Sequence, residues 1–547
     1  MSRRNDLGNP AFRTRARRYI NRHFHIIFQR MVYVLLFATI QIAFFVWLFV
    51  YMTRLTPLFL VICALLSLPA AMHVINKNSN PAIKIAWLIP LFTLPIFGGL
   101  LYLMFGYRRV NRRLTAVTED IRADYRTAGS HADGQIGGSD DSPVTGAPVP
   151  IDEDTVAAQA PRDAALQSAY IARASGCLPF TGTDTTYYPS GTALFGDLCE
   201  ALRSAKRYIF LEYFIIEEGV FWDTVLDILT ERAAAGVEVR VMYDDFGSML
   251  TLPLNYERFL RERGIRAHVF NPFNTVLSPR PNNRDHRKIT VVDGVVAFLG
   301  GINLADEYIG VYEKHGQWKD TAVRLTGDGA WGVAIQFLAV WDADTKSGTD
   351  LQLYCPQKSN APAVENGIVQ PYTDIPMDNE QVGETVYFQM ITRAERYIYI
   401  TTPYLIIDHE LLVALQTAAK SGVDVRIVTP HIPDKKSVFL LTRSYYKPLL
   451  DAGVKIYEYT PGFIHAKSMI TDDRFAVVGS INLDYRSLYL HLENAVWMYN
   501  TTAVTDVRDD ILDTIAKSEE VHEDVLGKMT LGRRLWLSIL RTFAPLM

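Results

Sequence analysis

The chain has 547 residues, 49% of them apolar, which is enough for several domains with sizeable hydrophobic cores. The formal net charge of −4 argues against a general nucleic-acid-binding protein. Four widely spaced cysteines without a Cys-x-x-Cys pair predict free thiols rather than a disulfide framework or a zinc site. The sequence contains neither a Walker-type phosphate loop nor an HExxH motif, so nucleotide hydrolysis and zinc chemistry have no support.

The amino-terminal part begins with a basic arm and continues with apolar sequence. Residues 1–30 contain eight arginines and one acidic residue. Three apolar stretches follow, at about Met31–Met52, Leu55–Ile75 and Ile83–Phe105, and each approaches or exceeds the roughly 20 residues that a membrane-crossing helix needs. Because these stretches contain almost no ionisable residues, residues 31–106 are predicted to form a transmembrane segment of two to three helices.

The orientation of this segment stays open. Arginines flank it on both sides, so the positive-inside rule favours both flanks in the cytoplasm, which three full crossings cannot satisfy. Either one stretch does not cross, or one basic flank lies outside. Pro90, Pro95 and Gly98–Gly99 would let the third stretch bend back, although such residues also occur in spanning helices. We expect a multi-pass protein of the cell membrane with its catalytic part facing the cytoplasm.

Residues 107–165 are predicted to be a flexible linker. Their central part, at about 128–150, is rich in glycine, serine, alanine and proline and has no apolar period. Such a segment cannot bury enough surface to offset the entropy lost on ordering.

The rest of the chain is an internal repeat with a first half at 166–360 and a second half at 361–525. The stretch Gly-Val-Glu-Val-Arg in the first half matches Gly-Val-Asp-Val-Arg in the second. Strands that alternate with helices predict an α/β fold with a parallel or mixed sheet in each half, and two such halves would enclose a pseudo-two-fold cleft. The expected strands are Arg207–Ile216, Val237–Tyr243, Arg396–Ile400 and Val423–Val428, and the expected helices end at Ala235, Arg263, Lys420 and Ala452.

One motif occurs in both halves. It reads His-x-Lys-x-x-x-x-Asp, and it is followed by apolar residues, a small pair and an asparagine. On a β-strand, a histidine and a lysine two residues apart share a face. Its residues are His286, Lys288, Asp293 and Asn303 in the first copy, and His465, Lys467, Asp472 and Asn482 in the second.

The doubled motif predicts chemistry on a phosphodiester. An imidazole can attack phosphorus or move a proton near neutral pH, and an ammonium group can hold an anionic oxygen. One histidine would attack while the other protonates the leaving alkoxide, with lysine and amide groups stabilising the phosphoryl oxygens. A single copy would more often be a solvated strand edge, but two copies with the same downstream pattern favour an active site.

These motifs resemble those of the phospholipase D superfamily, and the chain is similar to bacterial cardiolipin synthases over nearly its full length. That family typically has two amino-terminal spans, whereas this chain has an additional apolar stretch and a longer linker. The supporting stretches are residues 80–88, 211–216, 243–248, 284–289, 300–308, 402–404 and 479–487.

The resemblance implies a phosphatidyl transfer that needs neither a metal nor a cofactor. One phosphatidylglycerol would donate its phosphatidyl group to a histidine and release glycerol, and the headgroup hydroxyl of a second phosphatidylglycerol would attack the phosphohistidine to give cardiolipin. His286 is expected to be the nucleophile and His465 the general acid and then base. The other partner is anionic membrane lipid; nucleic acid is not expected, and protein partners stay open.

The resemblance also implies roles for polar residues around the histidines. Four of them would hold the phosphoryl oxygens: Lys288, Lys467, Asn303 and Asn482. Asp293 and Asp472 are expected to fix backbone or lysine geometry rather than to move protons. Glu493 and Asp320 are candidates to orient a histidine. Glu212 is either a residue of the cleft mouth or a solvated acid at a strand end.

Two other functions compete with this interpretation. A phospholipase D-type hydrolase acting on a phospholipid or a nucleic acid would share the first half-reaction and differ in the acceptor. A non-catalytic membrane scaffold would keep the fold without the chemistry, but both motifs are intact. The amino-terminal apolar segment favours a lipid substrate, and the lack of a basic run near either motif disfavours DNA.

The carboxyl-terminal tail, residues 526–547, is predicted to be amphipathic. Its apolar residues Leu535, Trp536, Ile539, Leu540 and Phe543 recur at helical spacing, with Arg533, Arg534 and Arg541 around them. Two interpretations stay open: a final helix packed on the soluble core, or a helix lying in the headgroup layer of a membrane.

Overall fold

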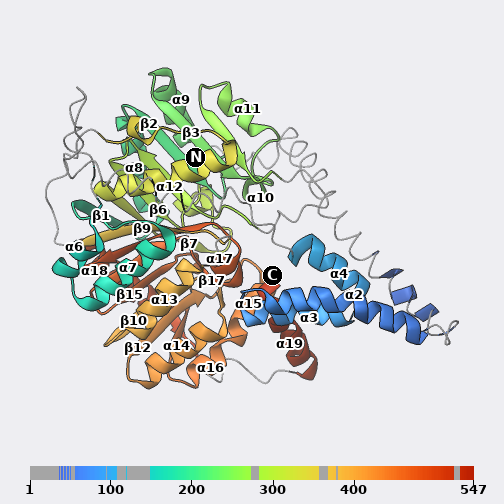
Figure 1. The fold of residues 1–547 in the computed structure, drawn as a ribbon. Coiled ribbons are helices and arrows are strands. Elements are labelled where there is room, and N and C mark those ends of the chain that lie inside the picture. The colour runs from blue at the N-terminus through green and yellow to red at the C-terminus, as the bar shows by residue number, and fades with distance from the viewer. Residues whose placement is uncertain are drawn as a thin grey trace.

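The computed structural model describes residues 56–93, 95–106, 151–272, 283–356, 367–376, 380–522 and 530–546, with a few single residues before 56 and between 107 and 150. Figure 1 shows two halves, each built on a β-sheet, and a group of amino-terminal helices that lies beside the second half. The α/β duplication predicted from the sequence is therefore confirmed.

The first half contains a seven-stranded mixed sheet with the order β1-β8-β6-β5-β2-β3-β4. Strands β2, β3 and β4 are parallel, and the other neighbours are antiparallel. The strands are β1 Thr183–Tyr188, β2 Tyr208–Tyr213, β3 Glu238–Asp244, β4 Arg266–Phe270, β5 Lys288–Val292, β6 Val296–Gly300 and β8 Ala322–Gly327. The helices are α8 Gly191–Ser204, α9 Val220–Ala234, α10 Asp245–Ser248, α11 Tyr256–Arg261, η4 Asp306–Ile309, α12 Asp328–Thr345 and η5 Leu351–Leu353.

The second half repeats this order in an eight-stranded sheet, β19-β13-β12-β10-β15-β16-β18-β9. Its strands are β9 Ile368–Asp374, β10 Tyr397–Thr401, β12 Asp424–Pro430, β13 Lys455–Tyr459, β15 Ser468–Thr471, β16 Phe475–Gly479, β18 Glu493–Tyr499 and β19 Ser518–Glu520. Its helices are α13 Val382–Thr392, α14 His409–Lys420, α15 Lys436–Ser444, α16 Tyr446–Leu450, α17 Tyr485–Tyr489 and α18 Thr502–Ala516.

The matching sequence stretches occupy matching positions. Gly236 follows α9 and Gly422 follows α14, with φ angles of +91° and +97°. Glycine adopts this left-handed conformation without the steric cost that other residues incur, so each helix can end and the chain can enter the next parallel strand. The repeated glycine therefore marks the same helix-to-strand turn in each half.

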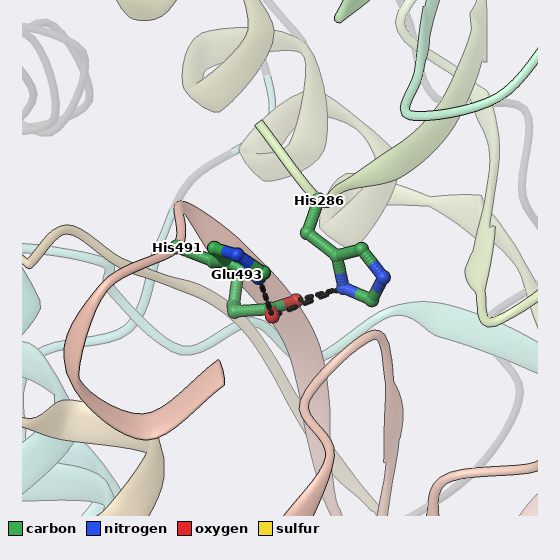
Figure 2. Close-up of side chains that lie close together, drawn as sticks. All are labelled: His286, His491 and Glu493. Atoms are coloured by element: carbon green, nitrogen blue, oxygen red, sulfur yellow. Dashed lines mark hydrogen bonds and ion pairs between the residues drawn. The ribbon is translucent and has the colours of Figure 1, made fainter. Parts of the chain in front are cut away.

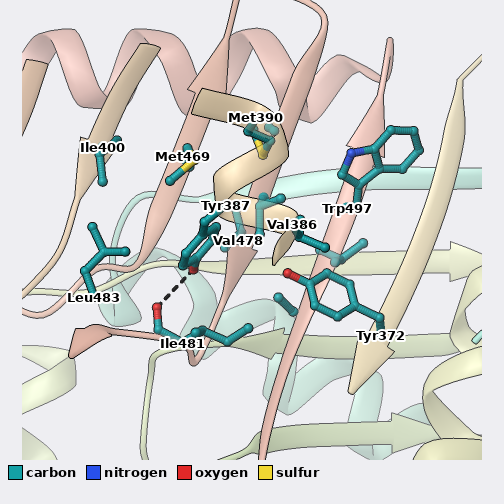
Figure 3. Close-up of a cluster of buried hydrophobic side chains, with 14 of the residues drawn as sticks. Tyr372, Val386, Tyr387, Met390, Ile400, Met469, Val478, Ile481, Leu483 and Trp497 are labelled. Atoms are coloured by element: carbon teal, nitrogen blue, oxygen red, sulfur yellow. Dashed lines mark hydrogen bonds between the residues drawn. The ribbon is translucent and has the colours of Figure 1, made fainter. Parts of the chain in front are cut away.

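A continuous core joins the two halves. Helix α12 packs on strands of the first sheet and on β9 of the second, and it is almost entirely buried. Within the second half, Tyr372, Val386 and Trp497 belong to a buried cluster beneath the repeated motif (Figure 3). The hydroxyl of Tyr387 in this cluster donates to the carbonyl oxygen of Ile481 at 2.9 Å, which ties the segment before Asn482 to α13.

Short strands complete the structure. The pair β7 Gln317–Lys319 and β14 Gly462–Ile464 joins the two halves in parallel register, and β11 Leu405–Ile406 pairs with β17 Leu483–Asp484 within the second half.

The amino-terminal helices differ from the predicted transmembrane segment. They are α2 Thr56–Asn76, α3 Pro81–Thr93, α4 Pro95–Leu101 and η2 Tyr102–Gly106. Among the described residues, no helix has both the length and the apolarity that crossing a membrane requires. The third apolar stretch is broken between α3 and α4, and a Cβ atom on Gly98 would lie 2.0 Å from the carbonyl oxygen of Pro90. Proline and glycine therefore let α4 fold back on α3; most of the first stretch lies outside the described residues.

The turn between α2 and α3 is attached to the second half. The amide nitrogen of Asn80 donates to Asp408 at 3.0 Å and to the hydroxyl of Tyr489 at 2.8 Å. The hydroxyl of Tyr489 in turn donates to Asp408 at 2.7 Å. Helix α3 also packs on the helices at the carboxyl terminus, residues 531–546. The amino-terminal helices are therefore packed against the second half.

The predicted linker is wrong in its last part. Helices α6 Glu153–Gln159 and α7 Arg162–Ser175 occupy residues expected to be flexible. The carboxylate of Asp152 caps α6 by accepting from the backbone N–H of Thr155 at 2.7 Å, and Val156 is buried. Ala164 is fully buried because α7 packs on β9 and α13. Residues 107–150 lie almost wholly outside the described residues.

The tail forms α19 Leu531–Phe543 and η7 Ala544–Leu546. Leu537 and Leu540 are buried, and the guanidinium of Arg541 lies 4.6 Å from the ring centre of Tyr445. The other face is exposed: Leu535 is 64% exposed and Trp536 is 53% exposed. One face of the helix therefore packs on the core, and the opposite face is apolar and open.

Candidate active site

The first histidine is held by the second half. His286 lies just before β5 rather than within it, and its backbone N–H donates to the carbonyl oxygen of Leu492 at 2.9 Å. Its ring Nδ1 lies 3.0 Å from both carboxylate oxygens of Glu493, at the start of β18 (Figure 2). Both His286 and Glu493 are buried.

The second histidine is held by the first half in the same way. The backbone N–H of His465 donates to the carbonyl oxygen of Lys319 at 2.6 Å. Its ring Nδ1 lies 2.5 Å from the carboxylate of Asp320, which follows β7. In both cases the carboxylate residue comes directly after the residue that accepts the backbone bond. The two halves therefore exchange carboxylates about a pseudo-two-fold axis.

This arrangement fixes which ring nitrogen can react. A carboxylate beside Nδ1 favours the tautomer that carries its proton there, so Nε2 of each ring has a lone pair for attack or proton transfer. The predicted role of Glu493 and Asp320 in orienting the histidines fits this geometry.

The two lysines are buried beside the histidines. The Nζ atoms of Lys288 and Lys467 donate to the backbone carbonyl oxygens of His286 and His465, two residues earlier. Burial lowers the pKa of Lys288 to about 7, against the opposing effect of Glu493. Burial likewise lowers the pKa of Lys467 to about 8, against Asp320. Each lysine therefore loses its proton more readily than an exposed lysine does.

The same environment lowers the pKa of both histidines. Burial, then the charges of Lys288 and Lys467, lower the pKa of His286 well below its usual value. Burial and Lys467 lower the pKa of His465 to about 4, although Asp320 opposes this. Since each motif affects the histidine of the other, the four side chains belong to one site. A neutral imidazole is the form that acts as a nucleophile or a base.

The two motif asparagines are used differently. The side-chain oxygen of Asn303 accepts from the backbone N–H of Ile215 at 3.0 Å, and its amide nitrogen donates to the hydroxyl of Tyr308 at 2.7 Å. Asn482 is 5% exposed, and its side-chain oxygen has no hydrogen-bond partner among the described residues. The first amide is committed to the fold, and the second is available to a ligand.

The motif aspartates lie away from the histidine rings, where they organise the backbone. The carboxylate of Asp293 accepts from three consecutive N–H groups at the start of β2, and Asp472 does the same at β10. Both aspartates have left-handed backbone angles, with φ of +53° and +56°. This placement fits the expected backbone role.

Glu212 lies in a buried ion pair with Arg287. Arg287 also donates to Asp285 at 3.2 Å, and it alternates with His286 and Lys288 along the chain, so it points to the other face. Glu212 is therefore neither a residue of the cleft mouth nor a solvated acid, the two alternatives for it, because it is fully buried in this ion pair.

Two rings that the repeated motif does not indicate pack on the histidines. The centroid of His491 lies 5.4 Å from that of His286, and the centroid of Trp318 lies 5.4 Å from that of His465. Each of these residues is two positions before the exchanged carboxylate. Aligning the halves on Glu493 and Asp320 would have revealed both.

One group could also bind a metal ion. His286, His491 and Glu493 each offer a ligand atom, and these atoms lie within 4.8 Å of one another (Figure 2). Two imidazoles and a carboxylate suit zinc and similar ions.

Comparisons with known proteins agree with this site. The family described as "Cardiolipin synthase, PLD-like domain" matches residues 198–313 and 387–514, which contain both motifs, and "Phospholipase_D-nuclease N-terminal" matches residues 65–106. Cardiolipin synthase 2 of Bacillus cereus is 33% identical over 86% of this chain and 88% of its own. A cardiolipin synthase of Geobacillus sp. is 34% identical over 86% and 90%, respectively. An uncharacterized protein of Streptococcus mutans is 41% identical over 87% of this chain and 99% of its own.

These matches define the class of protein: the chain is an enzyme of the phospholipase D superfamily that transfers phosphatidyl groups. Within that superfamily it belongs to the cardiolipin synthase family, as the resemblance of its motifs predicted.

Proposed function

We propose that this enzyme makes cardiolipin and glycerol from two molecules of phosphatidylglycerol through a phosphohistidine intermediate. The observation that carries the proposal is the exchange of carboxylates, by which Glu493 and Asp320 each support a buried histidine of the other half. One imidazole Nε2 can then bond phosphorus while the other serves the leaving and entering alkoxides.

The two steps balance without a further reactant. One imidazole enters the cycle as an imidazolium whose charge is balanced by the carboxylate beside Nδ1. In the first step, Nε2 of the other imidazole bonds phosphorus, the phosphorus–oxygen bond to glycerol breaks, and the imidazolium gives its Nε2 proton to the glycerol oxygen. In the second, the hydroxyl of the second phosphatidylglycerol loses its proton to that imidazole and bonds phosphorus, and the histidine is released. Each half-reaction is an in-line displacement at phosphorus, the first at a phosphodiester and the second at the phosphohistidine.

The surrounding groups can stabilise the charge that develops on the phosphoryl oxygens. Lys288 and Lys467 supply two buried ammonium groups, and a low local dielectric strengthens their attraction for an anion. The amide nitrogen of Asn482 makes no hydrogen bond to any described residue, so it can donate to a phosphoryl oxygen, whereas the amide of Asn303 is already bonded at both ends. We therefore assign the phosphoryl contact to Asn482 and a structural role to Asn303.

We further propose that the enzyme works at the cell membrane, with its catalytic part on the cytoplasmic side. The support is the exposed apolar surface on the amino-terminal helices and α19: Leu58, Val61, Leu65, Leu68, Met72, Leu535 and Trp536 are all exposed. A substrate with two acyl chains stays in the bilayer, so an enzyme that rests on the bilayer can reach it.

Product analysis tests the proposal. The full-length enzyme is incubated with vesicles of phosphatidylglycerol labelled in the headgroup glycerol, and the lipids and water-soluble products are separated. Cardiolipin with one glycerol released per cardiolipin is the expected result. Phosphatidic acid as the main product would identify a hydrolase, and no product would leave a non-catalytic protein.

A further inference from the structure

The pseudo-two-fold axis provides an internal comparison of the surroundings of the two histidines. Arg486 lies 21 residues after His465, and Glu307 lies 21 residues after His286. His491 and Trp318 are likewise equivalent, since each precedes the exchanged carboxylate by two residues. The fold repeats at these positions, but the side chains differ. The second half has an arginine where the first has a glutamate, and a histidine where the first has a tryptophan.

The basic pair lies on the side of His286. The Nε of Arg486 donates to Nε2 of His491 at 3.2 Å, and Nδ1 of His491 lies 3.6 Å from Glu493, which holds His286. Because Nε of arginine can only donate, Nε2 of His491 accepts, and the proton of this ring lies on Nδ1, the atom that faces Glu493. Four side chains thus form one row, from the Arg486 guanidinium to the reactive ring of His286.

Arg486 has no carboxylate within ion-pair distance among the residues that the structure describes. Arg486 is half-buried. Since the Nε atom is committed to His491, the two terminal nitrogens present the paired donors that suit a phosphate. The equivalent Glu307 would repel an anion, and it accepts from the hydroxyl of Tyr312 at 2.6 Å.

We infer that Arg486, positioned by His491, binds the phosphate of the second phospholipid, the one that accepts the phosphatidyl group. The inference rests on the proposed function, because only a transfer to a phosphorylated glycerol requires a second phosphate near the first. In such an acceptor, the attacking hydroxyl and its own phosphate are separated by the three carbons of one glycerol. A hydrolase, whose acceptor is water, needs no such group.

The position of this phosphate assigns the two histidines. An acceptor held by Arg486 brings its hydroxyl to phosphorus from the side of His286. An in-line displacement then requires the breaking bond on the opposite side, at Nε2 of His465. His465 therefore forms the phosphohistidine, and His286 gives the proton to glycerol and later takes the proton from the acceptor. These roles are the reverse of those that the family resemblance implied.

Soluble acceptors test the subsite with the full-length enzyme. Labelled phosphatidylglycerol is the donor, and glycerol or glycerol phosphate is the acceptor, with KM and kcat measured for each. The wild-type enzyme should prefer glycerol phosphate by about tenfold or more in kcat/KM, the scale of paired charge-assisted hydrogen bonds. Inorganic phosphate should raise the apparent KM for glycerol phosphate and leave that for glycerol unchanged. If it raised both equally, it would bind the reacting centre, and the subsite would be rejected.

Variants separate binding from folding. Arg486→Gln should raise KM for glycerol phosphate about tenfold or more and leave kcat/KM for glycerol within about threefold. Arg486→Lys keeps the charge but not the paired donors, so its KM for glycerol phosphate should lie between those of the wild-type enzyme and Arg486→Gln. The matched control, Glu307→Gln at the equivalent position, should keep the wild-type preference. An unchanged preference in Arg486→Gln, or equal losses with both acceptors, overturns the inference.

The donor half-reaction distinguishes the two proposals. Exchange of free labelled glycerol into phosphatidylglycerol reports phosphatidyl transfer without using the subsite. If no exchange occurs, the proposed function fails; if exchange occurs without a preference for glycerol phosphate, only the subsite fails. Rapid quenching with phosphorus-labelled donor should find the label on His465. A label on His286 would contradict the inference that the acceptor approaches from the side of His286.

Discussion

The Nδ1 of His286 lies 3.0 Å from both carboxylate oxygens of Glu493, although 207 positions separate the two residues in the chain. The hydroxyl of Ser480 also donates to this carboxylate, so His286, Ser480 and His491 together determine its orientation. A negative charge that is fixed in this way can stabilise the imidazolium that forms when His286 holds a proton on Nε2. The first half therefore supplies the reactive ring, and the second half supplies the group that supports it.

Substitution of either histidine should abolish transfer. His286→Ala and His465→Ala should each lower kcat by at least about three orders of magnitude, because one bond-forming and one proton-transferring group are both required. The double variant should be little worse than either single variant, since the residues act as a unit. Cardiolipin formation from labelled phosphatidylglycerol measures the rates, and losses that simply multiply would contradict a shared site.

The two motif asparagines should respond differently to removal. Asn482→Ala should lower kcat about 100-fold or more, as loss of a preorganised donor to a phosphoryl oxygen does, with little change in Tm. Asn303→Ala should lower Tm, because the N–H of Ile215 and the hydroxyl of Tyr308 lose their partner. Parallel kinetics and thermal unfolding decide this; equal kinetic losses at unchanged Tm would restore both asparagines to the reaction.

The lysines should make activity and stability move in opposite directions with pH. The pKa of Lys288 is about 7 and that of Lys467 is about 8, so kcat/KM should fall as pH rises through this range and the cations are lost. An unfolded chain keeps these lysines protonated up to about pH 10.4, so it binds more protons than the folded state. The free energy of unfolding should therefore rise between pH 7 and 9, because the folded state no longer has to hold these two charges in its interior.

Lys288→Met checks that assignment. The variant should lose most activity and should show a smaller rise of stability with pH than the wild-type enzyme, measured by denaturant unfolding at several pH values. If the free energy of unfolding of the variant rose with pH as steeply as that of the wild-type enzyme, groups other than Lys288 would cause the rise.

Chelation should leave transfer intact, because the chemistry assigned to this site uses only histidine, lysine and amide groups. Full activity should survive dialysis against EDTA, whereas added zinc should inhibit by occupying His286, His491 and Glu493. His491→Asn should weaken that inhibition. Activity that is lost with EDTA and returns with only one divalent ion would contradict a metal-independent reaction.

The open face of α19 should contact lipid. Replacing Leu535 and Trp536 together by serine removes two exposed apolar side chains and should weaken sedimentation with phosphatidylglycerol vesicles about tenfold or more, with little change in Tm. Leu353→Ser is the matched control, since Leu353 is 67% exposed but belongs to η5 of the first half. Equal vesicle binding by both variants would assign α19 to the core alone.

Much of this architecture could be predicted, because local patterns determine it. Alternating strands and helices with repeated glycines indicated both halves, and the doubled motif indicated His286 and His465. The carboxylates were only candidates, because a pairing across 207 or 145 positions depends on how the halves pack and not on local sequence. The apolar length of residues 83–105 predicted one helix, but the prolines and glycines divided it.

Residues that break the repeat were harder to predict. Arg486 and His491 have no like partner in the first half, so a search for repeated motifs passes over them. The difference between Asn303 and Asn482 is also invisible in sequence, because it depends on Tyr308 and the backbone of Ile215 reaching one amide and not the other.

The exchanged carboxylates also suit an origin of the two halves by gene duplication. If each half descends from a single unit, two copies of that unit related by a two-fold axis would each lend a carboxylate to the histidine of the other. Duplication and fusion of the gene would turn this intermolecular exchange into the pairs His286–Glu493 and His465–Asp320. Once both units were in one chain, each could change alone, and the difference between Arg486 and Glu307 would be such a change. A symmetric ancestor would explain two equivalent histidines, and fusion would allow one of them to serve the proposed acceptor while the other does not.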